Sequence, residues 1–277
     1  MTTSHHRLRE AGYHVTASTL SLLWLLPIIL VLVTGLRSFD DIAQHGVGSL
    51  PHSFTFDGFA QAWTNGGAAQ ALINSMLVTI PTVVVTLALA SIAAFALSRY
   101  DIPLRRTVLL TMLAGNLLPP QILLVPVAKL SEVLGIYDSL VALVVVQVGF
   151  GLGFYTFVLH GFMRAIPSEI QQAAVIDGAS AGQVFLRIIL PLTRPALAAL
   201  SALAFTWVFN DLLWAITVLR SEDRMPVTPA LLGLQGQFVS MWNVIAAGSV
   251  IAAIPTVVVF LRFQRHFVAG LALGAVK

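Results

Sequence analysis

Ser168–Pro191 reads SEIQQAAVIDGASAGQVFLRIILP and forms a polar interruption between long apolar runs. The stretch predicts two short helices, because each half opens with the Ser-x-x-Gln spacing of a capping box, at Ser168 and at Ser180. Between the halves, Asp177-Gly178 predicts a helix end, since glycine adopts the left-handed conformation without a Cβ clash. We therefore expect a compact helical hairpin around a sharp turn.

The second helix of this hairpin is predicted to have one apolar face. Its apolar residues recur at helical spacing: Val184, Phe185, Ile188 and Ile189. A helical hairpin with an apolar stripe, held outside a bilayer, has a shape that docks into a groove of another protein. The stretch therefore predicts an element that couples this chain to a partner.

The composition indicates that the rest of the chain lies in a membrane. Hydrophobic residues make up 57% of the 277 residues and charged residues 10%, and the mean hydropathy is +0.89. Soluble domains carry about 25% charged residues, so we predict an all-α polytopic membrane protein. At about 20 apolar residues per crossing, six transmembrane helices are expected, of which only the fifth contains a formal charge, Asp211. The segments are Val15–Leu36, Ala71–Ser98, Thr107–Ala128, Ser139–Met163, Pro195–Leu219 and Trp242–Leu261.

The placement of basic residues predicts the orientation. With the N-terminus inside, the cytoplasmic segments hold Arg7, Arg9, Arg99, Arg105, Arg106, Arg164, Arg187, Arg194, Arg262, Arg265 and Lys277, and the outer segments hold only Arg37, Lys129, Arg220 and Arg224. Basic residues favour the cytoplasmic side, so both termini and the hairpin are expected there. The net charge of +3 comes from residues spread along that face, which argues against a nucleic-acid partner.

Several chemistries are not expected of this chain. It contains no cysteine, no HExxH motif and no G-x-x-x-x-G-K-[ST] phosphate loop. We therefore predict that it is not an enzyme, that it has no catalytic or metal site, and that any ATP and magnesium are bound by a separate subunit. Gly149 and Gly153, inside an apolar crossing, predict close helix packing instead of a nucleotide site.

The hairpin resembles a known motif. The run QAAVIDGA at Gln172–Ala179, followed by Ile188, Leu190 and Pro191, is similar to the cytoplasmic EAA loop of bacterial ABC importer permeases. That resemblance implies that the loop inserts into a cleft on an ATPase subunit and transmits closure of the ATP-bound dimer to the membrane helices. The residues expected to carry this coupling are Gln172, Ala173, Ala174, Asp177, Gly178, Ile188, Leu190 and Pro191.

The resemblance extends along most of the chain. Leu72–Pro103 looks like the second and third segments of carbohydrate importer permeases, and Phe263–Lys277 resembles the end of the maltose-type second permease subunit. It implies a type I ABC importer permease fold in a prokaryotic plasma (inner) membrane. The implied partners are a second permease subunit, an ABC ATPase dimer, an extracytoplasmic solute-binding protein, a carbohydrate and the lipid bilayer. The expected division is a lead of residues 1–14, a permease domain of residues 15–267 with its coupling loop at 164–191, and a tail of residues 268–277.

One position departs from the family pattern. Gln172 occupies the place of the family's glutamate, and Glu169 lies about one turn upstream. Any ion pair made by that glutamate would become a neutral hydrogen bond here, which is about half as strong.

The fifth crossing contains the candidate substrate path. Trp207, Asn210, Asp211 and Trp214 are spaced by three and four residues, which predicts one helical face. Carboxylates and amides bind sugar hydroxyls, and indole rings stack on the apolar faces of sugars. The similarity of Phe205–Leu219 to the aromatic-Asn-acidic stretch of sugar permeases also implies a place near the path. The alternative is that Asn210 and Asp211 contact the sister subunit.

Other features lead to more local expectations. Pro119, Pro120 and Pro126 are predicted to break the third helix. The outer loop Arg37–Gln70 is expected to be extended before a short helix around Phe59–Trp63, and the resemblance implies that it forms a docking lip for the binding protein. Polar residues within crossings either line the path or bond to one another: Asn74, Asn116, Gln121, Gln147 and Asn243. The tail is expected to be flexible, and the resemblance implies that it contacts the ATPase.

Two other functions remain open at this stage. The first is an importer permease for glycerol-phosphate-type solutes, since close relatives import them. The second is a membrane protein that senses or supports and does not transport. The sequence favours a carbohydrate importer, with a di- or oligosaccharide as the expected substrate.

Overall fold

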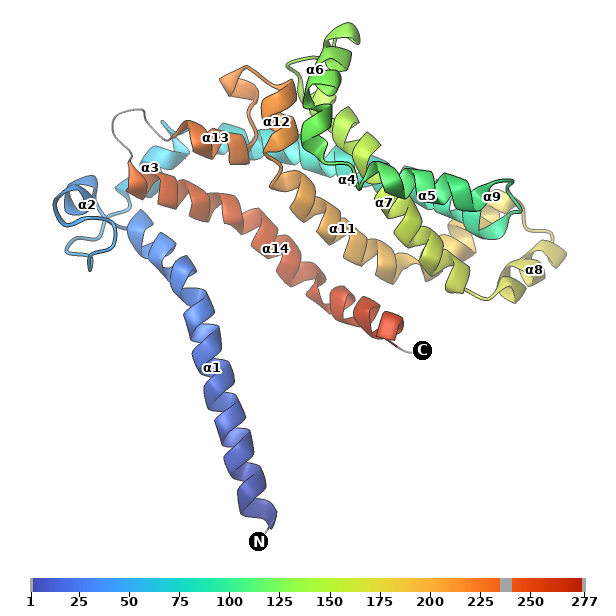
Figure 1. Ribbon diagram of the computed structural model, residues 1–277, viewed down its shortest axis with the longest axis horizontal. Helices are drawn as coiled ribbons and strands as arrows, with labels where there is room; N and C mark the ends of the chain where they lie inside the picture. Colours follow the sequence, from blue (N-terminus) through green and yellow to red (C-terminus); the bar gives the residue numbers. More distant parts are fainter. Residues whose placement is uncertain (1, 235–240, 276–277) are drawn as a thin grey trace. The chain divides into compact units, whose positions relative to one another are not determined.

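The computed structural model describes residues 2–234 and 241–275, and every regular element within these ranges is a helix (Figure 1). This confirms the predicted all-α class. The chain divides into two compact units, Met1–Ala68 with Leu231–Ala253 and Ala69–Ala230 with Ile254–Lys277.

Four helical segments are long and apolar enough to cross a membrane. They are Gly12–Gly35, Ala68–Arg99, Leu140–Ala165 and Trp242–Gln264, and they correspond to the first, second, fourth and sixth predicted crossings. Two bent helix pairs add two more only if each pair counts as one span. The described residues therefore contain four to six candidate spans, and the number six stays a prediction.

Pro119 and Pro120 break the third predicted crossing, as expected, whereas Pro126 lies in the first turn of the helix that follows and does not break it. Helix α5 (Arg105–Gly115) ends before Pro119, a 3-10 turn η1 (Pro120–Leu123) follows, and α6 (Leu124–Val133) continues the chain. The two halves are bent by 87°. Because proline has no N–H and clashes with the preceding turn, an α-helix does not pass straight through this run.

The first unit contains two short helices after α1 (Thr2–Gly35). Helix α3 (Asp57–Trp63) confirms the short helix predicted there. Helix α2 (Phe39–His45) replaces part of the expected extended segment. Ala62 of α3 is buried against Val244 and Ala247 of α14 (Trp242–Ala275), and these residues form the core of the unit.

Both ends of the chain are more helical than predicted. Helix α1 begins at Thr2, so the described residues 2–14 of the expected lead are part of a helix. Helix α14 ends at Ala275, so the expected flexible tail is helical as far as that residue, and Val276 and Lys277 lie outside the described residues.

The second unit is built around α4 (Ala68–Arg99), α7 (Leu140–Ala165) and α11 (Arg194–Phe209). Their buried side chains form one cluster, and small residues among them allow the helices to approach closely. The cluster includes Leu87, Ala90, Ala94, Phe95, Tyr155, Leu159, Met163, Leu200 and Ala204.

A carboxylate joins two loops of the second unit. Asp138 Oδ1 accepts hydrogen bonds from the backbone N–H groups of Arg220 (2.8 Å) and Ser221 (3.0 Å), and Oδ2 accepts one from the Ser221 hydroxyl. The hydrogen bonds from the Ser221 side chain and backbone lower the pKa of Asp138 to about 2. Asp138 therefore stays ionised as the pH falls, and it keeps these hydrogen bonds until the pH approaches its lowered pKa.

Gly149 and Gly153 differ sharply in their surroundings, although the sequence predicts close packing at both. A Cβ at Gly153 would collide with the carbonyl oxygen of Met112 on α5, whereas a Cβ at Gly149 would have no atom within 4 Å. Helix α7 therefore approaches the backbone of α5 closely at Gly153. The packing prediction is confirmed for Gly153 and wrong for Gly149.

We expect Gly153→Ala to lower the thermal stability of the protein. The added methyl group forces α5 away from α7, and such overpacking costs about 1–3 kcal/mol. Gly149→Ala is the matched control and should unfold like the wild type. Size-exclusion chromatography of heated detergent extracts measures both variants, and equal melting temperatures would contradict the close contact.

Candidate functional site

The predicted hairpin is present, and it begins differently from the expectation. Helix α8 (Ser168–Ile176) starts at Ser168 after Pro167, and no side chain caps its described N-terminus, so the capping box predicted at Ser168 is wrong. Pro167 occupies the N-cap position with an extended backbone, and its side chain has no oxygen that could accept the first N–H groups of the helix. The second capping box is confirmed, since the Ser180 N–H donates to Gln183 Oε1 (2.8 Å) and the Gln183 N–H to Ser180 Oγ (3.4 Å).

The turn between the two helices requires Gly178. The residue has φ of +84°, in the left-handed region that side chains with a Cβ adopt at a cost. The Ala179 N–H donates to the Ala174 carbonyl (2.9 Å) and the Gly178 N–H to the Val175 carbonyl (3.0 Å), which satisfies carbonyls that the helix end leaves without partners. The predicted helix stop is confirmed.

The same turn spells GASAG at Gly178–Gly182, the spacing of the GxSxG nucleophile elbow of hydrolases. That elbow places its serine between a strand and a helix. Here Ser180 lies between two helices, and its hydroxyl accepts the N–H of Gln183. The serine therefore acts as a helix cap in this structure.

In the second half of the hairpin, the helical pitch changes before Leu190 and Pro191, the Leu-Pro pair of the family motif. Helix α9 (Ala181–Val184) passes into a π-helical turn, Phe185–Ile189, and then into α10 (Leu190–Leu192). The Leu190 N–H donates to the Phe185 carbonyl, five residues back. Inserted π turns are frequent at functional sites. This wide turn contains Ile188 and lies directly before Pro191.

The apolar face of the second helix does not face outward. Val184 and Ile189 are 1% and 0% exposed, and they are packed in the same cluster as α4 and α7. Phe185 contacts Phe95 of α4, with ring centroids 5.0 Å apart. The prediction that this face docks into another protein is therefore wrong: it attaches the hairpin to the chain's own membrane helices.

The surface that remains open belongs to α8 and the turn. Val175 and Ile176 are 56% and 85% exposed. Of the predicted coupling residues, Gln172, Ala173, Asp177 and Gly178 are exposed, Ala174 is buried, and Ile188, Leu190 and Pro191 are half-buried. The set therefore separates into an outer group on α8 and the turn, and an inner group where the hairpin meets the second unit.

The base of the hairpin is tied to α4. Arg99, the last residue of α4, donates from Nη2 to the carbonyls of Met163 (2.6 Å) and Ile166 (3.1 Å) at the end of α7. The chain enters α8 two residues after Ile166. A displacement of the hairpin therefore acts on α4 and α7 through both this arginine and the apolar cluster.

The candidate path residues do not share one helical face. Helix α11 ends at Phe209, Asn210 to Leu212 are not helical, and α12 (Leu213–Val218) resumes the chain. Asn210 donates from Nδ2 to the Thr206 carbonyl (2.8 Å) and so caps its own helix. The single face predicted from the spacing is wrong because the fifth crossing is interrupted at these residues.

Three of the four path residues nevertheless line one cavity of about 240 Å³: Trp207, Asp211 and Trp214. Asp211 Oδ2 accepts the Ala215 N–H (3.2 Å) and lies 3.5 Å from Gln147 Nε2 of α7. Trp214 is 7% exposed and stacks on Phe150 with centroids 4.5 Å apart. The carboxylate is therefore held at the cavity wall between α7 and α12.

Sequence reasoning missed two further polar groups of this cavity. Thr82 and Thr86, one turn apart on α4, line it, and their buried hydroxyls have no hydrogen-bond partner among the described residues. Asn116 and Gln147, for which the sequence left two roles open, also line it. Asn74 does not: it donates to the carbonyls of Asp223 and Met225. In the sequence, a threonine of an apolar helix looks the same whether it lines a cavity or packs against a neighbouring helix.

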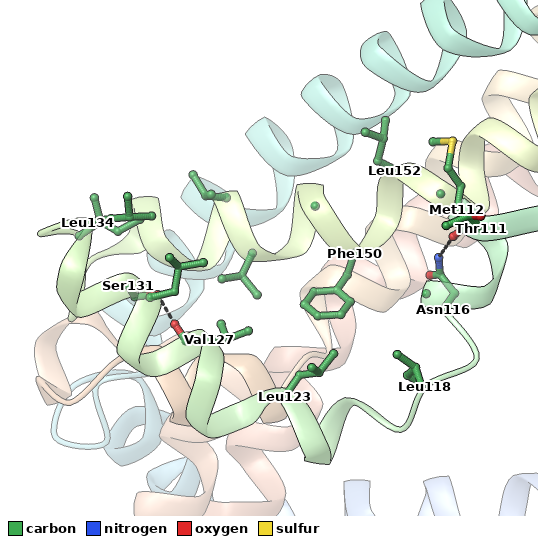
Figure 2. Close-up of a pocket in the computed structure, with 17 residues that line it drawn as sticks. Thr111, Met112, Asn116, Leu118, Leu123, Val127, Ser131, Leu134, Phe150 and Leu152 are labelled. Carbon is green, nitrogen blue, oxygen red and sulfur yellow. Dashed lines mark hydrogen bonds between the residues drawn. The ribbon is translucent and has the colours of Figure 1, made fainter. Parts of the chain in front are cut away.

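A second, larger cavity of about 530 Å³ lies between α5, α6 and α7. Figure 2 shows Phe150 pointing into it, with Leu123, Val127 and Leu134 around it. Its few polar side chains include Asn116 and Ser131, which bond to the carbonyls of Met112 and Val127 on their own helices. Most of its wall is apolar, so it offers few hydrogen bonds to a polar solute.

Comparison with known proteins adds to this geometry. A family model described as the binding-protein-dependent transport system inner membrane component matches residues 72–272. The chain is 31% identical to the trehalose transport system permease protein SugB of Mycobacterium tuberculosis, over 97% of this chain and 98% of that protein. It is 35% identical to the alpha-glucoside transport system permease protein AglG of Rhizobium meliloti, over 82% of this chain and 61% of that protein.

The fold also matches a solved structure. A chain of a bacterial ABC transporter involved in the import of the acidic polysaccharide alginate superposes with a TM-score of 0.81 at 23% identity, covering 94% of this chain and 97% of that chain. This likeness confirms the predicted importer-permease fold.

The two tryptophans of the cavity should respond differently to truncation. Trp214→Ala removes a buried ring stacked on Phe150, so we expect a loss of about 3–5 kcal/mol of stability. Trp207 is 56% exposed, so Trp207→Ala should leave the melting temperature near that of the wild type. Thermal unfolding in detergent compares them, and equal losses would show that both rings are structural.

Proposed function

The chain belongs to the family of binding-protein-dependent transport system inner membrane components, and on this premise we propose that it is the membrane-spanning permease subunit of an ATP-driven carbohydrate importer. It is a multi-pass membrane protein. The observation that carries the proposal is the hairpin of α8 to α10, in which the family's motif residues divide between an exposed outer part, on α8 and the turn after it, and a half-buried inner part, in the π turn and α10. Relatives named as trehalose and alpha-glucoside permeases support a carbohydrate substrate.

The chemistry of the smaller cavity fits a sugar. A carboxylate, two threonine hydroxyls without partners and two indole rings surround it. Sugars carry hydroxyl groups that need such partners and apolar ring faces that pack on aromatic side chains. None of the residues described in its wall is arginine or lysine, which favours a neutral carbohydrate over a glycerol-phosphate-type solute. We propose a di- or oligosaccharide.

The energy source lies outside this chain in our proposal. A separate ABC ATPase dimer binds ATP and magnesium, a second permease subunit completes the pathway, and an extracytoplasmic binding protein delivers the sugar. Both termini and the hairpin face the cytoplasm, in agreement with the basic residues on that side. A related alginate transporter has been solved with an oligosaccharide-bound periplasmic protein, which supports this type of assembly.

The coupling proceeds through the packing of the hairpin. Closure of the ATPase dimer moves α8, and the buried residues Val184 and Ile189 transfer the movement to α4 and α7. The nucleotide can shift the permease between inward- and outward-facing states only if the hairpin contacts differ between them. A hairpin packed rigidly against α4 and α7 links such a difference in contacts to these helices, whereas a freely hinged loop would not.

We expect Gly178→Val to abolish sugar uptake while leaving membrane insertion intact. A residue with a Cβ pays about 1–2 kcal/mol in the left-handed region, and a β-branched one more, so the turn is rebuilt and α8 is misplaced. Gly182→Ala is the matched control, since Gly182 lies in α9 with nothing within 4 Å of an added Cβ. Uptake of radiolabelled sugar by cells with equal membrane levels measures the effect, and full uptake by Gly178→Val would exclude the coupling role.

Asp211→Asn distinguishes the two roles left open for this carboxylate. If Asp211 binds substrate, the KM for uptake should rise by about tenfold or more, while the second permease still co-purifies. If it holds the sister subunit instead, co-purification is lost. Asp101→Asn, on the exposed segment between α4 and α5, is the control and should change neither quantity.

A further inference from the structure

Two histidines and a carboxylate converge in the loop after α1. His45 ends α2, and His52 follows it by seven residues on the segment that leaves the helix. The Nδ1 atoms of these residues lie 3.1 Å and 3.4 Å from the same oxygen, Oδ1 of Asp41. This cluster lies in the first unit, apart from the hairpin and the cavities of the second.

The carboxylate of this cluster is fixed by its other oxygen. Asp41 Oδ2 accepts hydrogen bonds from Arg37 Nε (2.7 Å) and from the backbone N–H of His52 (3.2 Å). Arg37 is 1% exposed, so this contact is shielded from water. These bonds leave Oδ1 directed toward the two imidazole rings. Carboxylates and histidines that bind metals are usually oriented by hydrogen bonds of this kind.

The loop backbone is fixed by the same arginine. Arg37 Nη1 donates to the carbonyls of Gly46 (3.2 Å), Val47 (3.2 Å) and Ser49 (3.1 Å). The chain therefore turns tightly after α2 and returns to Asp41 at His52. Three side chains that are separated in the sequence are brought together before any ligand binds, which lowers the ordering cost of binding.

The spacing of the three atoms fits a small divalent cation. Zinc binds nitrogen and oxygen at about 2.0–2.2 Å, so two ligands of a tetrahedral site lie about 3.4 Å apart. The three candidate atoms lie within 4.8 Å of one another, and two of their separations are 3.1 Å and 3.4 Å. The rings are stacked with centroids 4.1 Å apart, and their side chains are 41% and 58% exposed, so they can tilt toward a shared ion without moving buried atoms.

We propose that Asp41, His45 and His52 form a binding site for Zn²⁺ or a similar imidazole-preferring divalent cation. The site provides three protein ligands and keeps a fourth position open to water or to a group from another molecule. A bound ion joins α2 to the segment around His52 and closes the loop between them. The proposal does not depend on the transport function.

Metal binding by the full-length chain in lipid nanodiscs tests this site directly. The protein should be purified with a tag that contains no histidine, and titrated with Zn²⁺ against a fluorescent chelator and with Co²⁺ by visible absorption. We expect His45→Ala and His52→Ala each to weaken Zn²⁺ binding by more than about tenfold and to remove the tetrahedral Co²⁺ bands. His14→Ala, which alters an exposed histidine of α1, is the matched control and should bind as the wild type does.

The two variants keep the test independent of folding. Both rings are exposed, so the variants should elute from size-exclusion chromatography like the wild type. Equal Zn²⁺ affinity of the wild type and both variants would overturn the site, because the ion would then bind elsewhere. Absence of Co²⁺ bands in the wild type would also overturn it.

Discussion

Backbone groups left open inside a membrane must find a partner within the protein, and this constraint governs the two broken helices of the second unit. Lipid offers no hydrogen bonds, so the last carbonyls of a helix that stops in the membrane are costly unless a side chain reaches them. Asn116 follows the last residue of α5, and its side chain donates to the Met112 carbonyl. Asn210 follows the last residue of α11, and its side chain donates to the Thr206 carbonyl. At the end of both helices, an asparagine side chain donates to the backbone carbonyl four residues before it.

These breaks determine where the polar cavity forms. At the second break Asp211 accepts the Ala215 N–H at the start of α12, so one carboxylate both satisfies the new helix and faces the cavity. The first break contributes Asn116 and Pro120 to the same wall. Phe150 stacks on Trp214 and lines the apolar cavity as well as the polar one. An unbroken pair of helices would offer no comparable place for a carboxylate.

Much of the hairpin could be predicted from the sequence because its signals are local. Gly178 and the Ser180 capping box depend on residues within one turn, and both formed as expected. The apolar periodicity of Val184 and Ile189 predicted that a face is buried, but not what buries it: periodicity contains no information about the partner. The chain's own helices cover that face.

The interruption at Asn210 and the cluster at Asp41 escaped the sequence for a related reason. The run from Phe205 to Leu219 contains no proline or glycine, so spacing alone favoured one continuous helix. At the break, Asp211 lies beside Gln147 of α7, a contact that is distant in the sequence. In the loop, His45 and His52 are brought together by Arg37, which bonds to three carbonyls between them. Contacts of this type depend on the tertiary fold and leave no periodic signal.

The exposed face of α8 also accounts for a glutamine, Gln172, at the position of the family's glutamate. Gln172 is exposed, and it has lost the charge that an ion pair with a partner would use. Nearby Ile176 is 85% exposed and Val175 is 56% exposed, so both leave apolar surface uncovered on the hairpin. Covering them in a partner's cleft removes apolar surface from water and stabilises the contact without any ion pair. In our proposal, docking of this hairpin therefore relies on shape and apolar contact, and the rigid turn at Gly178 matters more than the charge at position 172.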